Sequence, residues 1–64
     1  MTEGNLKLFM AAQGWNKVTT ARELGITRET LDKYLAKGAP RTIGLACAAL
    51  AAGLAEWQDP AGDN

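Results

Sequence analysis

The chain has 64 residues, with seven basic and seven acidic side chains, one cysteine and no histidine. This composition excludes a disulfide framework within the chain and a zinc site built from cysteine and histidine. A chain of this length makes one small domain, and its longest apolar stretch, Ile43–Ala55, has 13 residues, fewer than the roughly 20 that cross a membrane.

A first helix is expected over residues 2–13. Leu6, Phe9 and Met10 recur at the spacing of one helical face, which predicts that they pack into the core. Gly14 follows directly and is typical of the residue that ends a helix.

Two short helices joined by a tight turn are expected next, over residues 17–24 and 28–37. Gly25 ends the first of them where the backbone must turn left-handed, a conformation that costs glycine little. Ala21 is small enough for the second helix to cross closely over it, and Thr27 can cap that helix. This spacing is typical of a helix-turn-helix, whose second helix lies in the major groove of DNA.

The helix over residues 28–37 divides into an apolar and a polar face. Leu31, Tyr34 and Leu35 share the apolar side and should be buried. The polar side is what a recognition helix would present to base edges, and it carries Arg28, Glu29, Asp32, Lys33 and Ala36. The alternative is a solvent-exposed face with two ion pairs at a spacing of four residues, Arg28 with Asp32 and Glu29 with Lys33.

The charges of the chain are segregated although they sum to zero. Residues 17–41 contain six basic and three acidic side chains, a local net charge of +3, and most of the remaining acids lie toward the C-terminus. A basic face is therefore possible on a neutral protein.

A fourth helix is expected from Arg41 to Trp57. One of its faces carries the larger apolar residues, Ile43, Cys47, Leu50, Leu54 and Trp57, among which Cys47 is expected as a small core residue. The opposite face is nearly as apolar, and its members form a candidate dimer interface: Leu45, Ala48, Ala49 and Ala52. A helix that is apolar all round must be buried on both sides, which favours a homodimer. The alternative is that alanine is a good helix former and tolerates exposure.

These elements place the domain at residues 1–57 and leave residues 58–64 as a disordered or frayed acidic tail. No nucleophile is paired with a base, and no glycine-rich phosphate loop follows a strand. We therefore expect no enzyme, no cofactor, no metal and no small-molecule substrate.

The run from Lys17 to Tyr34, KVTTARELGITRETLDKY, resembles the helix-turn-helix of the Cro/CI (XRE-type) repressor family. Together with residues 35–50 it is similar to small anti-CRISPR-associated regulators of phages and mobile elements. The resemblance implies a compact, all-α, lambda-repressor-like domain of four helices, and a homodimeric repressor that binds an inverted repeat in a promoter.

The same resemblance assigns contact positions on DNA. Base contacts fall on Thr27, Arg28, Glu29, Asp32 and Lys33, and Lys17 and Thr19 match the start of the helix that meets phosphate. The family often has glutamine at the position of Lys17. It usually has an aliphatic residue at the position of Thr20, which predicts looser packing there.

We therefore expect a cytoplasmic, nucleoid-associated regulator whose partners are double-stranded DNA and a second copy of the chain, with no membrane association. Arg28 is the first candidate for a guanine contact, and Lys17, Lys37 and Arg41 should anchor the DNA backbone. Two alternatives stay open. One is a helical adaptor or inhibitor that binds another protein through the alanine-rich fourth helix, and the other is a phage DNA-packaging or recombination accessory factor.

Overall fold

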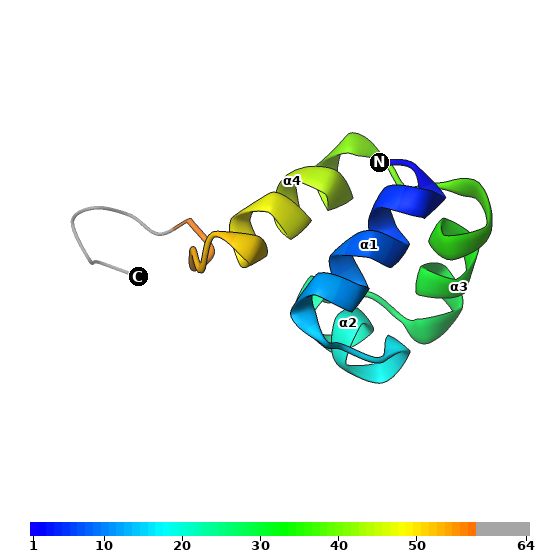
Figure 1. Cartoon of the computed structure of the whole chain (residues 1–64), viewed down its shortest axis with the longest axis horizontal. Coiled ribbons are helices and arrows are strands. Elements are labelled where there is room, and N and C mark those ends of the chain that lie inside the picture. The colour runs from blue at the N-terminus through cyan, green and yellow to red at the C-terminus, as the bar shows by residue number, and fades with distance from the viewer. Residues whose placement is uncertain (58–64) are drawn as a thin grey trace.

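The computed structural model describes residues 1–57, which form four α-helices and no strand (Figure 1). The helices are α1 (Glu3–Gln13), α2 (Lys17–Leu24), α3 (Arg28–Lys37) and α4 (Arg41–Ala51). The predicted all-α class with four helices is confirmed. The acidic tail expected at residues 58–64 lies outside the described residues.

The first three helices begin at side chains that cap them. In each case the residue before the helix accepts a hydrogen bond from a backbone N–H three residues later, at 2.8 to 3.1 Å. Such a cap satisfies one of the N–H groups that a helix leaves without a partner at its start. The capping residues are Thr2, Asn16 and Thr27. α4 begins after Pro40 without a side-chain cap.

Gly25 ends α2 in the left-handed conformation that the sequence predicts, with a φ of 70°. Its N–H donates to the carbonyl of Arg22, and the N–H of Ile26 donates to the carbonyl of Ala21 at 3.0 Å. These two bonds make the Schellman closure that glycine favours. The chain leaves α2 sharply at this point and enters α3 two residues later.

α4 is shorter than the sequence predicts, since it ends at Ala51 and not at Trp57. Gly53 turns left-handed with a φ of 74°, and the N–H of Leu54 donates back to the carbonyl of Ala49 at 2.9 Å. The same closure that ends α2 therefore ends α4. Residues 54–57 leave the helix, and Trp57 is 82% exposed.

Each helix contributes one buried apolar side chain to the core: Leu6, Ala21, Leu31 and Cys47. α3 packs against α1 and α2, and α4 packs against the same two helices. Figure 1 shows α1 between α3 and α4, so that α4 lies on the far side of α1 from α3. The predicted apolar stripe of α1 is confirmed, with Leu6 fully buried and Phe9 and Met10 half-buried.

Thr20 is fully buried in α2, at the position where looser packing was expected. Its hydroxyl donates to the carbonyl of Asn16 at 2.8 Å, so the polar group is satisfied within its own helix. Within residues 1–57 no buried side-chain nitrogen or oxygen lacks a hydrogen-bond partner. The threonine hydroxyl is therefore accommodated in the core.

The connection between α3 and α4 is fastened to the start of the chain. The amino group of Met1 donates to the carbonyl of Ala39 at 2.9 Å, and the N–H of Ala39 donates to the carbonyl of Met1 at 2.8 Å. Met1 also packs against the core. This reciprocal pair fixes the point at which α4 begins. No helix within residues 1–57 has the length and apolar character that crossing a membrane requires.

Candidate nucleic-acid interface

The α2–turn–α3 unit presents one face of α3 to solvent. Leu31 is fully buried, and Tyr34 and Leu35 are half-buried against the core. The opposite side of α3 is exposed and carries Arg28, Glu29, Asp32 and Lys33. The division into an apolar and a polar face is therefore confirmed, and four of the five candidate base-contacting side chains are exposed to solvent.

Thr27, the fifth candidate, is occupied as the cap of α3. Its hydroxyl accepts from the N–H of Thr30 at 3.1 Å and donates to the hydroxyl of Thr30 at 2.9 Å. The proton of Thr27 is thus used within the protein. A contact from Thr27 to DNA would have to use its methyl group or its remaining lone pair.

The two ion pairs predicted along α3, Arg28 with Asp32 and Glu29 with Lys33, do not form within residues 1–57, so that prediction is wrong. Asp32 pairs instead with Lys17 of α2, with 3.0 Å between Nζ and Oδ1. The turn at Gly25 brings the start of α2 beside the second turn of α3, and residue spacing within one helix gives no sign of this contact. Among residues 1–57, Arg28, Glu29 and Lys33 form no ion pair.

The second ion pair of the described chain joins neighbouring residues of α2. Arg22 Nε lies 3.9 Å from Glu23 Oε1, and the arginine side chain is mostly exposed. A long, solvent-exposed pair of this kind contributes little to stability. It leaves the charge of Arg22 available on the outside of the motif.

The candidate phosphate-contacting residues lie on α2, α3 and α4. Lys17 is the first residue of α2, Lys37 is the last of α3, and Arg41 is the first of α4; all three are exposed. Thr19 is half-buried, and its N–H donates to the Asn16 side chain in the cap of α2. The structure therefore places Lys17 beside the second turn of α3, Lys37 at its C-terminal end, and Arg41 at the start of the next helix.

The candidate dimer residues lie mainly on the outer side of α4. Leu45 is 56% exposed, Ala48 and Ala52 are exposed, and Ala49 is half-buried. Ala52 follows the last helical residue and caps α4. This surface lies on an element that α1 separates from α3 (Figure 1).

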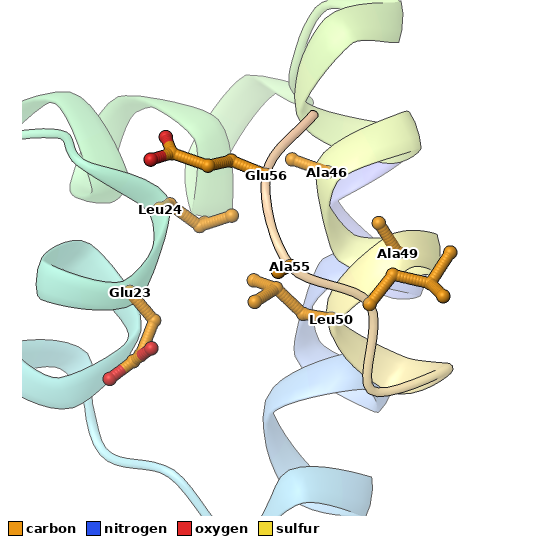
Figure 2. A pocket seen from close by; sticks show the side chains of 8 residues that line it. Glu23, Leu24, Ala46, Ala49, Leu50, Ala55 and Glu56 are labelled. Atoms are coloured by element: carbon orange, nitrogen blue, oxygen red, sulfur yellow. The ribbon is translucent and has the colours of Figure 1, made fainter. Parts of the chain in front are cut away.

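Beside this surface an open pocket of ≈ 220 Å³ lies between α2 and α4 (Figure 2). Leu24, Leu50 and Leu54 give it apolar walls, and Glu23 and Glu56 also line it. Leu54, which the sequence places on α4, reaches the pocket from the segment that follows the helix. Gly53 in the sequence is the signal that could have indicated that α4 ends before Leu54.

Cys47 is buried in the core, as expected. Burial raises the pKa of the Cys47 thiol above its ordinary value of 9.0, and the positive amino group of Met1 opposes this shift more weakly. The thiol is therefore neutral at physiological pH and unsuited to nucleophilic chemistry.

Residues 6–38 match the family model of the bacterial regulatory proteins of the Fis family. The matched segment runs from within α1 to just past α3, and so contains the whole helix-turn-helix. Comparisons with curated proteins and with solved structures give no match. The family that matches is not the Cro/CI family, and the helix-turn-helix is what the resemblance and the match have in common. Because the match covers more than half of the chain, the protein belongs to the Fis family of bacterial regulatory proteins and is a DNA-binding transcriptional regulator.

Proposed function

We propose that the protein is a homodimeric repressor that binds an inverted repeat in a promoter, with α3 of each subunit in the major groove. The observation that carries this proposal is the outer face of α3, where Arg28, Glu29 and Lys33 are exposed and free of ion pairs within residues 1–57. The buried side of α3, anchored at Leu31, holds this face outward.

In this proposal the charged side chains have two roles. Arg28, at the N-terminal end of α3, donates two hydrogen bonds to guanine, a contact worth about 1–3 kcal/mol of discrimination between bases. Glu29 and Lys33 supply further base contacts. The phosphate contacts come from Lys17, Lys37 and Arg41, and Thr19 lies near the DNA strand that Lys17 contacts. These contacts set the position of the protein on DNA without reading sequence.

The outer side of α4 supports the dimeric part of the proposal. The large apolar side chain of Leu45 is exposed to solvent, and the alanines beside it allow a second helix to approach closely. Pairing through α4 would leave α3 of both subunits free. A dimer whose recognition helices lie about 34 Å apart reads two half-sites one helical turn apart.

Selection of bound sequences from a random duplex pool tests the proposal. We expect a palindromic consensus with half-sites one turn apart, and a site of this kind within a promoter that the protein shuts off. Arg28→Ala should lose the preference at one position of each half-site. Lys37→Ala should weaken all duplexes alike and, because each dimer loses two phosphate contacts, reduce the dependence of log affinity on log salt by about two units.

These variants form a matched pair, since both remove one exposed positive charge from α3. If Arg28→Ala leaves the ranking of sites unchanged, the base contact is assigned to the wrong residue. A consensus without two-fold symmetry would contradict the dimer on an inverted repeat. Failure of the wild type to bind any duplex at low salt would contradict the placement of α3 in the groove.

A further inference from the structure

We propose that Asp32 is a positioning residue that holds Lys17 at the edge of the DNA-reading face, and that it does not itself read a base. This inference rests on the proposed function, because it takes α3 to lie in the major groove. It separates the two acids of α3 into different roles: Asp32 acts through Lys17, and Glu29 is left as the acidic side chain able to contact a base.

The ion pair joins the two helices of the motif. Lys17 is the first residue of α2, Asp32 lies in the second turn of α3, and their charged atoms are 3.0 Å apart. This is hydrogen-bonding distance for an ammonium and a carboxylate. The side chains of Lys17 and Asp32 keep exposed fractions of 47% and 49%, so a phosphate can reach Lys17 without breaking the pair.

The chemistry of lysine allows both contacts at once. An ammonium group has three N–H donors. One of them is directed to Asp32, which leaves two for a phosphate oxygen. The lysine stem is long and flexible, and the carboxylate restricts its head to a small region beside α3. Asp32 thereby prepares Lys17 for the DNA backbone before the complex forms.

The same contact disfavours base reading by Asp32. A carboxylate that reads cytosine must be free to accept a hydrogen bond from the exocyclic amino group of the base. The Oδ1 atom of Asp32 is engaged by Lys17, whereas Glu29 is exposed and makes no ion pair within residues 1–57. The negative charge of Asp32 is also compensated, which removes most of its repulsion toward phosphate.

Asp32→Asn and Glu29→Gln are matched changes, each replacing a carboxylate on the outer face of α3 by an amide. Their affinities are measured on a panel of duplexes that differ from the selected site at one base pair each. We expect Glu29→Gln to change the ranking at one position. Asp32→Asn should shift all duplexes by one common factor and leave the ranking intact, and Asp32→Glu, which keeps the carboxylate, should behave as the wild type.

A double-mutant cycle tests whether Asp32 acts through Lys17. In the wild type Asp32→Asn releases Lys17 from its position, so it should lower the affinity for every duplex by the same factor. In a Lys17→Met background no lysine is left to position and the carboxylate faces the DNA uncompensated, so the same substitution should no longer lower affinity. The two effects should differ by at least about threefold, within the range that contacting residues show. Circular dichroism of each variant verifies the fold.

The outcomes are separable. A re-ranking of duplexes by Asp32→Asn at one base position would show that Asp32 reads DNA, and this overturns the inference while the proposed function stands. Equal effects of Asp32→Asn with and without Lys17 would also overturn it. A wild-type protein with no preference among the duplexes would overturn the proposed function together with the inference.

Discussion

Cys47 shows how a single side chain can make the stability of this domain depend on pH. It lies in the core beside Leu6 and Leu31, and burial raises the pKa of its thiol. A group whose pKa is higher in the folded state stabilises that state as long as the group is protonated in both states. The contribution is present below the pKa of the unfolded thiol and is lost as pH rises through the pKa of the folded one.

We therefore expect the free energy of unfolding to fall as the pH rises through 9.0, the ordinary pKa of a cysteine thiol, because the unfolded chain then ionises before the folded one. Urea unfolding at a series of pH values measures this. Cys47→Ala is the control: it should be less stable at neutral pH because it leaves a cavity, and its stability should decline less steeply at alkaline pH. Parallel declines in the two proteins would contradict the assignment to Cys47.

The outer face of α3 could be predicted residue by residue, but its contacts could not. Helical periodicity identifies Arg28 and Lys33 as exposed because their positions follow from the burial of Leu31. The partner of Asp32 is different, since Lys17 belongs to another helix and meets Asp32 only after the turn at Gly25 has formed. Spacing within a helix predicted Arg28 as the partner, and the tertiary fold replaced it.

At the scale of the helices, the predictable boundaries are those marked by a specific residue. α2 begins after Asn16 and ends before Gly25, and both are visible in the sequence. The end of α4 was predicted wrongly because the apolar spacing continues to Leu54 and Trp57, and alanine favours helix. Gly53 ends the helix despite that spacing, since its left-handed conformation allows two closing hydrogen bonds.

Gly25 permits a sharp test of the turn. A Cβ added at Gly25 meets no atom within 4 Å, and the same holds for Gly4 in α1. Only the backbone conformation differs, with a φ of 70° at Gly25. Gly25→Ala should lower the free energy of unfolding by about 1–2 kcal/mol, and thus Tm by several degrees in a domain of this size. Thermal unfolding followed by circular dichroism measures the change.

Gly4→Ala is the matched control for this experiment. Gly4 lies in the first turn of α1 and is exposed, so alanine there should leave stability unchanged or raise it by up to about 1 kcal/mol. Equal losses in both variants would show that the left-handed conformation at Gly25 is not what makes glycine necessary.

For the molecule as a whole, the buried core is small, and one apolar side of α4 is exposed to solvent. Four apolar side chains are buried within residues 1–57, whereas Leu45 and Trp57 are largely exposed. The four-helix architecture was predictable because length, periodicity and helix ends agree with one another. Whether α4 is covered by a second subunit depends on surfaces outside a single chain, and it stays a prediction.

Leu45→Glu tests this prediction. A charge at the centre of a helix–helix contact would be buried without a partner, so the variant should be monomeric at concentrations where the wild type is dimeric. Sedimentation equilibrium measures the mass. Leu8→Glu is the control, because Leu8 is a 69% exposed leucine on α1, outside the proposed interface. A wild type that sediments as a monomer would rule out the dimer, and dissociation by both variants would rule out α4 as its specific site.

The bond between Met1 and Ala39 has a consequence for the operators such a dimer would accept. Residues 38–40 connect α3 to α4, and this short connection is pinned by two hydrogen bonds. A dimer joined through α4 would then hold its two α3 helices at a fixed separation and orientation. One extra base pair in the spacer moves the second half-site by about 3.4 Å and turns it by roughly 35° about the duplex axis. Two α3 helices held without a hinge could not follow that rotation, so a dimer of this kind should bind half-sites at one spacer length.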